Sequence, residues 1–286
     1  MRTSARLACL LFPLLLGCDS TFLGEAEPDF NNPFTRGTSY ALQEPALQQV
    51  AAVTASQRHP GVLYMLDSGA GARLLATDEA GESLGEVRLT GVLRSGWQDL
   101  GLQDGRVLVL QTGPVNGRIL RFPEPSSPPP FDTEVAEEDS MSFTLPDAAV
   151  SSCSGLGVTD MQTAIWLLCG NRLYQLQPSF GGNGVQTAAA AGGLSLKFDL
   201  GTLRDLSLSP GGQFVLLSGT ERALTAQAAS AEDPQWASQL SDKASLVEWP
   251  ESFPAPEGGS FAFNSVLLYI VAPQMPQGQM FAIFNP

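Results

Sequence analysis

The most constraining feature of the sequence is a repeated unit of short apolar segments. Runs of apolar and β-branched residues recur between glycine, proline, aspartate and serine, and none shows a capped helical period. The unit of strand, turn, apolar strand, short loop and strand returns about every 40–55 residues. The expected strands are 62–66, 73–77, 84–89, 98–102, 106–111, 118–122, 155–158, 164–169, 172–176, 205–208, 213–218, 222–226, 259–263, 265–271 and 279–284. This period predicts an all-β fold, a β-propeller with five four-stranded blades, or six as the alternative.

The two ends of the repeat predict how the ring closes. The fifth unit ends at Pro286 without an outer strand of its own, and residues 38–42 (TSYAL) precede the first unit. An N-terminal strand from this segment would complete the last blade and remove two sheet edges. We therefore expect residues 38–286 to form the propeller. A β-sandwich is the alternative, although it would not explain the long repeat.

Two segments interrupt the pattern. Residues 123–140 (PEPSSPPPFDTEVAEEDS) are proline-rich and then acidic, which predicts an exposed loop between the third and fourth strands of the second blade. Residues 181–193 (GGNGVQTAAAAGG) have low complexity and no charge, which predicts a slack surface loop. The acidic part, residues 131–139, and the proline run before it are the candidates for contact with a partner.

The N-terminus has the features of an export signal. Arg2 and Arg6 precede an apolar run, Leu7 to Leu16, that is too short to span a bilayer. The junction Leu-Leu-Gly-Cys ending at Cys18 resembles the lipobox of bacterial lipoproteins, in which the cysteine takes the lipid. We predict a signal peptide over residues 1–17, a lipidated tether over residues 18–37, and attachment to the inner or outer membrane of the bacterial cell envelope. An ordinary secretory signal is the alternative.

Composition limits the classes of partner. The charged fraction is only 15% and the hydrophobic fraction is 43%, so the chain can build a real core and is not a charge-solvated disordered protein. The formal net charge is -14, which repels phosphate backbones and argues against nucleic-acid binding. We expect a monomer that contacts the membrane through its lipid at Cys18 and binds an envelope protein.

The cysteines predict one cross-link. The chain has four, of which Cys9 lies in the signal peptide and Cys18 is the expected lipid site. Cys153 and Cys169 remain in an exported, oxidising setting, on two expected strands joined by a turn at 159–162. This spacing places them opposite each other, so we predict a disulfide, with two free thiols as the alternative. A zinc site would need two further ligands.

Several motifs are similar to a known group of bacterial propellers. Residues 53–102 resemble a blade and a half with the pattern PGVLW…NDSG…RLFALD…DWEDIAL. Residues 206–222 (LSLSPGGQFVLLSGTER) are similar to the LSYDP…LLVLSDESR blade of SdiA-regulated propellers, and residues 256–271 (PEGGSFAFNSVLLYIV) to their AEGIAFD…LYIVSEP blade. The resemblance to this phytase- and esterase-like family covers most of residues 40–286. It implies five blades and, in some members, a bound calcium ion.

The sequence departs from that pattern where the family places its acids. Leu66 stands where the pattern has asparagine, and Gly96 and Gln98 stand where it has carboxylates. Four acids remain near blade starts: Asp67, Asp99, Asp205 and Glu257. If they converge they would form a weak Ca²⁺ site, and otherwise each would cap a turn. We expect no other cofactor.

No catalytic motif is evident. The single histidine, His59, precedes a proline in an expected turn, and we do not expect it to act in a Ser-His-Asp site. The sequence lacks the G-x-S-x-G, S-x-x-K, Walker A and H-E-x-x-H patterns. We therefore predict a lipid-anchored binding or scaffold module that is not an enzyme. The alternative is a degenerate calcium-dependent hydrolase of the phytase- or esterase-like type.

Overall fold

A computed structural model defines the fold. It describes residues 36–42, 46–47, 50–67, 69, 71–93, 95–147, 149–159, 164–196, 198–227, 240, 244–247, 258–261, 267–272 and 279–284. The strands are β1 (Arg36–Ala41), β2 (Val50–Ala55), β3 (Val62–Asp67), β4 (Arg73–Asp78), β5 (Ser83–Thr90), β6 (Trp97–Gln103), β7 (Arg106–Gln111), β8 (Gly117–Pro123), β9 (Phe131–Ala136), β10 (Asp139–Thr144), β11 (Cys153–Gly157), β12 (Ile165–Cys169), β13 (Arg172–Leu176), β14 (Val185–Thr187), β15 (Ala189–Gly193), β16 (Leu203–Leu208), β17 (Phe214–Gly219), β18 (Ala223–Gln227), β19 (Ala244–Leu246), β20 (Gly258–Phe261), β21 (Leu267–Ala272) and β22 (Gln279–Phe284). One short 3-10 helix, η2, covers Val150–Ser152. Within these ranges no helix is long and apolar enough to cross a membrane.

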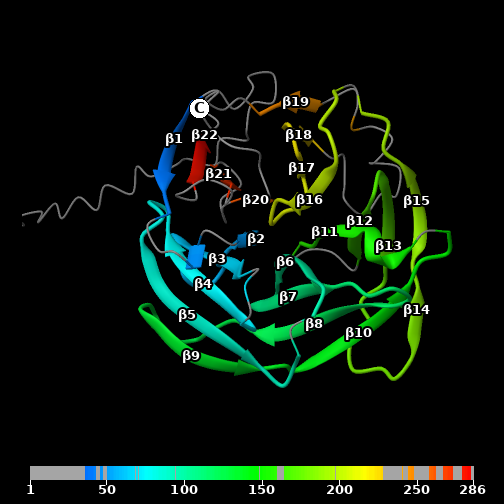
Figure 1. Cartoon of the computed structure of the whole chain (residues 1–286), viewed down its shortest axis with the longest axis horizontal. Helices are drawn as coiled ribbons and strands as arrows, with labels where there is room; N and C mark the ends of the chain where they lie inside the picture. The colour runs from blue at the N-terminus through cyan, green and yellow to red at the C-terminus, as the bar shows by residue number, and fades with distance from the viewer. Residues whose placement is uncertain are drawn as a thin grey trace, which may run out of the picture.

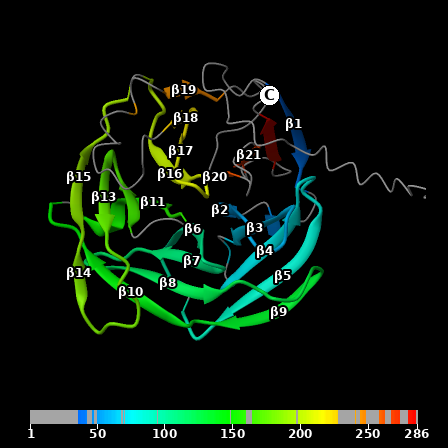
Figure 2. The same cartoon turned by 180° about the vertical axis from the view of Figure 1, so that it is seen from behind.

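The described strands pair into five sheets arranged around a common centre (Figures 1 and 2). We call them sheets I to V in chain order. Sheet I has the order β2-β3-β4-β5-β9, sheet II β6-β7-β8-β10-β14, sheet III β11-β12-β13-β15, sheet IV β16-β17-β18-β19, and sheet V β20-β21-β22-β1. The innermost strands contact one another in the cyclic order β2, β6, β11, β16, β20 and back to β2. This is a β-propeller arrangement, so the predicted all-β propeller class is confirmed.

Strand β1 lies at the outer edge of the sheet that contains the last strands of the chain. It pairs antiparallel with β22, from Arg36 opposite Phe284 to Ala41 opposite Gln279. The two ends of the described chain therefore share sheet V. Strand β1 begins at Arg36, slightly before the predicted start of the propeller at residue 38.

The core lies between neighbouring sheets. One cluster of buried side chains joins sheets I and II, with Tyr64 and Phe122 among its largest members. A second joins sheets II and III, and a third joins sheets III and IV around Trp166. The middle strands β3, β12 and β17 are buried along their whole length, because a propeller covers both faces of each blade. This explains why these segments read as continuous apolar runs.

Two predicted loops are instead partly strands, and both predictions are wrong. Residues 131–136 form β9, which leaves sheet II and pairs in parallel with β5 of sheet I. Residues 185–187 form β14, which pairs in parallel with β10 of sheet II, and 189–193 form β15 of sheet III. Each segment first adds a strand to the outer edge of the preceding sheet, and the chain then returns to form the outer strand of its own sheet. Proline and glycine occupy the connections, so composition concealed these short exposed strands.

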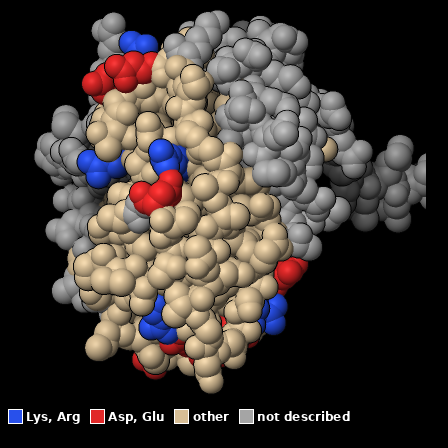
Figure 3. Space-filling view, turned by 90° about the vertical axis from the view of Figure 1, so that its right-hand side faces the viewer, with Lys and Arg blue, Asp and Glu red and all other residues tan. Residues whose placement is uncertain are grey.

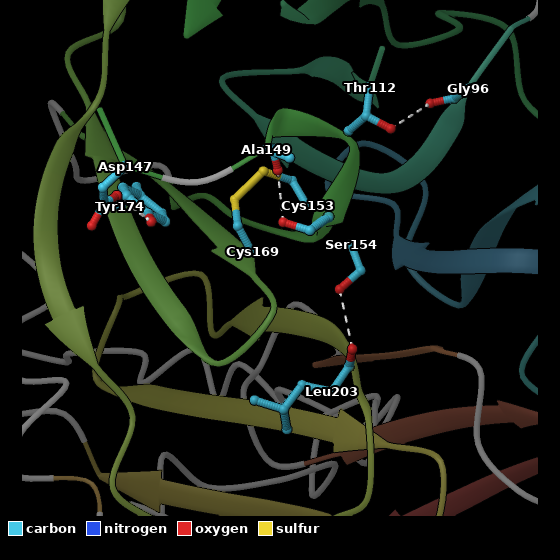
Figure 4. The surroundings of a disulfide bond; sticks show 10 residues. Gly96, Thr112, Asp147, Ala149, Cys153, Ser154, Cys169, Tyr174 and Leu203 are labelled. Atoms are coloured by element: carbon cyan, nitrogen blue, oxygen red, sulfur yellow. Dashed lines mark hydrogen bonds between the residues drawn. A yellow bond between two sulfur atoms is a disulfide. The ribbon is translucent and has the colours of Figure 1, made fainter. Parts of the chain in front are cut away.

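The predicted disulfide is confirmed. Cys153 on β11 and Cys169 on β12 are directly opposite each other, with a sulfur–sulfur distance of 2.05 Å (Figure 4). Both side chains are buried. Beside them, Ser154 Oγ donates a hydrogen bond of 3.3 Å to Leu203 O, which ties sheet III to sheet IV. The predicted turn at 159–162 lies mostly outside the described residues.

Removing this cross-link is expected to destabilise the protein. In the chain-entropy model, a closed loop of about 15 residues contributes about 3 kcal/mol, and measured values are often lower. The double variant Cys153→Ala with Cys169→Ala should therefore lose about 2–3 kcal/mol in denaturant unfolding. Reduction of the wild-type protein should produce the same loss, and an unchanged midpoint after complete reduction would contradict the prediction.

Candidate functional site

The innermost strands surround a narrow central channel. Toward the ends of these strands it contains a cavity of about 30 Å³, lined by residues of all five inner strands, including Thr54, Gly101, Leu156, Ser207 and Ser260. A cavity of this size holds about one or two water molecules and excludes an organic substrate.

Two predicted site residues, Asp99 and Asp205, occupy equivalent positions where inner strands begin. Asp99 follows a register shift in β6, and Asp205 follows the same kind of shift in β16. Asp99 accepts hydrogen bonds from its neighbour Leu100 N at 2.7 Å and from Leu156 N of β11 at 2.5 Å. Asp205 likewise accepts from Gly259 N of β20 at 2.6 Å. Each carboxyl group thus joins its own sheet to the next sheet in the ring.

Asp99 and Asp205 also contact each other. Their side chains hydrogen-bond together, and the residues are only 2% and 3% exposed. A hydrogen bond between two carboxyl groups requires a proton on one of them. Burial, followed by the charge of Asp205, raises the pKa of Asp99 well above its usual range. Burial also raises the pKa of Asp205 to about 6, although the hydrogen bond from Asp99 opposes the rise. Burial therefore favours the protonated form of both carboxyl groups, and the two titrate as a coupled pair.

A glycine occupies the corresponding position of the strand that lies between the two acids. Strand β11 lies between β6 and β16, and after its own register shift the corresponding residue is Gly155. A Cβ atom there would lie 2.7 Å from Leu206 N and 2.9 Å from Leu168 Cβ. A side chain at this position would collide with the neighbouring strands. Glycine at this position therefore permits the close packing of β11 against β16.

Asp67 has a different role, and Glu257 lies outside the described residues. Asp67 accepts hydrogen bonds of 2.7 Å from Gly69 N and from Arg73 Nε. It thus stabilises the turn between β3 and β4. Of the four predicted metal ligands, the structure brings together Asp99 and Asp205.

The described residues do not make up a calcium site. A calcium ion needs six to eight oxygen ligands, and the oxygens of the Asp99–Asp205 pair already accept backbone hydrogen bonds. In the part of the chain that the structure describes, no three histidine, cysteine or acidic side chains gather as metal ligands.

The single histidine belongs to a structural contact. His59 Nε2 lies 2.8 Å from Pro125 O, and its ring meets Phe131 edge-on at 5.7 Å. Its backbone N–H donates to Ser56 Oγ at 2.8 Å. These contacts hold the segment that leads into β9 against the loop after β2.

Sequence reasoning missed a buried acid in the same place. Glu124 directly follows β8 and is 2% exposed. Its Oε1 accepts hydrogen bonds from Ser56 Oγ at 2.5 Å and from Arg58 N at 3.3 Å. Arg58 Nη1 donates to Glu124 O at 3.0 Å. The buried carboxyl group of Glu124 therefore anchors the segment that crosses to sheet I. Because Glu124 stands in a proline-rich run, the sequence gave no sign of this role.

The outer rim of sheet I carries the densest ion-pair network of the described residues. A groove of about 640 Å³ lies over β4, β5 and β9. On its wall, Arg88 pairs with Glu86, Asp132 and Glu134 at 3.0–3.1 Å. In contrast, the rim at β14 and β15, on the right of Figure 1, faces the viewer in Figure 3, where charged side chains are scattered among uncharged ones.

The chain matches no protein-family model and no curated protein sequence. Solved structures do align with it. A luciferin-regenerating enzyme aligns at 10% identity and a TM-score of 0.48, over 87% of this chain and 95% of that one. The PQQ-bound aldose sugar dehydrogenase of Streptomyces coelicolor aligns at 13% identity and 0.44, over 88% and 99%. Hydrazine synthase of Kuenenia stuttgartiensis aligns at 12% identity and 0.41, over 77% and 68%. The propeller assignment rests on the sheets described above.

Proposed function

We propose that this protein is a monomeric, noncatalytic binding module, held at the bacterial cell envelope by a lipid on Cys18, and that β9 carries its partner-binding surface. We further propose that sheets I to V are the complete set of blades, closed by β1, in a relative of the SdiA-regulated propellers. The observation that carries the proposal is the ordering of the acidic segment into an exposed outer strand. Asp132 and Glu134 on β9 have side chains that are 82% and 60% exposed.

The position of β9 supports a binding role. Loops and edges that are held by a rigid scaffold are common sites of binding, because the scaffold removes the cost of ordering them. Glu124 and His59 fix the start of the crossing segment, and the β5 ladder fixes its length. Strand β9, which carries these acidic side chains, lies at the periphery of the ring (Figures 1 and 2).

The test is site-specific photo-crosslinking in living cells. A photoreactive amino acid is placed at Glu134 on β9 or, as a matched control, at exposed Ala190 on β15. We expect one discrete cross-linked partner at position 134 and none at position 190. Equal cross-linking at both positions, or none at position 134, would reject β9 as the binding surface.

The lipid anchor has its own test. Cys18 supplies the thiol that takes the lipid in the resembling signal peptides. The variant Cys18→Ser should lose the mass of the lipid and move from the detergent phase to the aqueous phase. A variant that stays in the detergent phase, or a wild-type protein of unmodified mass, would contradict lipidation.

The alternative function is a degenerate calcium-dependent hydrolase. The convergence of Asp99 and Asp205 favours it, because two buried carboxyl groups in contact are a common start of a cation site. Calorimetry with Ca²⁺ and a panel of phosphomonoesters and carboxylic esters would decide. We expect no binding tighter than about millimolar, the weak end for calcium modules. Micromolar binding that Asp99→Asn abolishes would favour the hydrolase.

A further inference from the structure

Strand β9 presents one row of backbone groups outward. It runs parallel to β5, with Gly85 opposite Phe131 and Thr90 opposite Ala136. Glu137 N donates to Thr90 O at 3.0 Å, and Thr90 Oγ1 donates to Val135 O at 3.4 Å. Because backbone groups alternate along a strand, the odd-numbered residues of this segment turn theirs toward β5. The backbone groups that turn away belong to Asp132, Glu134 and Ala136.

The outward edge is open among the described strands. Strand β9 is the terminal strand of sheet I, and Figures 1 and 2 both show it at the periphery. An open edge offers main-chain donors and acceptors in the spacing of a β-ladder. Proteins that do not use such an edge usually block it with proline, a bulge or a short strand, whereas β9 has six residues and an even register.

The charges on β9 select the partner. Asp132 and Glu134 lie on the same face of the strand, and on the β5 side Arg88 pairs with both, at 3.0 and 3.1 Å. Both carboxylates remain largely exposed, and the arginine itself also pairs with Glu86. A cationic side chain on an added strand would continue the alternation of charge across the face.

We propose that the outer edge of β9 binds an extended, basic peptide segment by strand addition. The proposal rests on the binding function proposed above and identifies the class of partner. Backbone N–H and C=O groups of the even-numbered residues pair with the segment, and lysine or arginine at alternate positions faces Asp132 and Glu134. A second copy of this acidic chain is disfavoured, since its net charge is -14.

Neighbouring edges fit such a segment less well. Strand β14 has only three residues, and β15 consists of alanine and glycine without charge. Both could pair a backbone, but neither would select a basic sequence.

The first test uses peptides of the length of β9. One alternates threonine with lysine, and a second alternates threonine with glutamate. Two more are the lysine peptide N-methylated at every second amide, one along the first edge of the strand and one along the other edge. We expect the lysine peptide to bind and to weaken with salt. The glutamate peptide should not bind, and N-methylation of one of the two edges should weaken binding about ten-fold or more. If the lysine peptide and both of its N-methylated forms bind equally well, strand addition is overturned.

The second test uses two variants that lose the same charge. Glu134→Gln keeps the outward N–H and should weaken lysine-peptide binding by a few fold. Glu134→Pro also removes that N–H while sparing the inward ladder, and it should weaken binding about ten-fold further. Equal affinities of the two variants would overturn the proposal. Thermal unfolding checks that both are folded, and if the proline variant is not, the N-methylated peptides decide.

These results remain distinct from those of the cellular cross-link. A discrete cross-link at position 134 without lysine-peptide binding would overturn the basic segment but leave β9 as the binding surface. Lysine-peptide binding that responds to Glu134→Pro, without a cellular cross-link, would support the edge and reject its proposed use in the cell.

Discussion

Stability is expected to fall as the pH rises from about 4 to about 8, because the buried carboxyl groups of Asp205 and then Asp99 must ionise in the folded protein. Burial raises the pKa of Asp205 from 3.8 to about 6 in the folded protein. The folded state therefore retains a proton that the unfolded chain has released, and the stability present below pH 4 is lost through pH 6. One pKa unit corresponds to about 1.4 kcal/mol, so Asp205 alone accounts for about 3 kcal/mol. Asp99, whose pKa is also raised, extends the loss to higher pH.

The variant Asp99→Asn isolates this contribution. Both Asp99 oxygens accept backbone N–H groups, and an amide can replace only one of them, so the variant should lose about 1–3 kcal/mol at pH 4. Asp205 remains in this variant and keeps the rise in pKa that burial causes, so the loss through pH 6 should persist, whereas the further loss that Asp99 causes at higher pH should be absent. Asp132→Asn, which changes an exposed acid, should leave the slope unchanged. Parallel curves for the wild type and Asp99→Asn above pH 6 in urea unfolding would refute the raised pKa of Asp99.

The variant Gly85→Ala is expected to displace β9 from sheet I. Gly85 has a φ of 101°, and a Cβ atom there would lie 2.0 Å from Phe131 O of β9. The left-handed backbone costs an alanine about 1–2 kcal/mol, and the overlap with a backbone oxygen adds about 1–3 kcal/mol. We expect a total loss of about 3–4 kcal/mol, with faster amide hydrogen exchange at residues 131–136.

The variant Gly170→Ala provides the matched control. Gly170 also has a positive φ, 63°, but a Cβ atom there would meet nothing within 4 Å. It should therefore cost only the conformational term, about 1–2 kcal/mol, and leave exchange in β9 unchanged. If both variants lose the same stability and β9 stays protected in each, the close approach of β9 to β5 is not the constraint that we describe.

The two acids of the channel show how far the sequence predicted the site. Their positions near blade starts were recognisable, because each follows the loop that leads into an apolar strand. Their contact was not, since it depends on register shifts in β6 and β16 and on how these two strands are placed around the ring. The same reasoning could not separate Asp67, which binds Arg73 in a turn, from the pair.

The repeated unit and the cross-link could both be predicted from the sequence alone. Period-two and fully apolar runs reflect local burial, so strands such as β7, β13 and β22 lie where the pattern predicts them. Cys153 and Cys169 are joined through a local hairpin, whose geometry follows from spacing along the chain.

The course of the crossing segments could not be predicted from the sequence, because it depends on tertiary contacts. Strand β9 pairs with β5, about 46 residues earlier in the chain, and no local propensity specifies such a partner. Its ladder exists because Gly85 leaves room, Glu124 is held inside, and Arg88 balances two exposed acids. These contacts are long-range, so local sequence patterns predicted a loop where the structure has an edge strand.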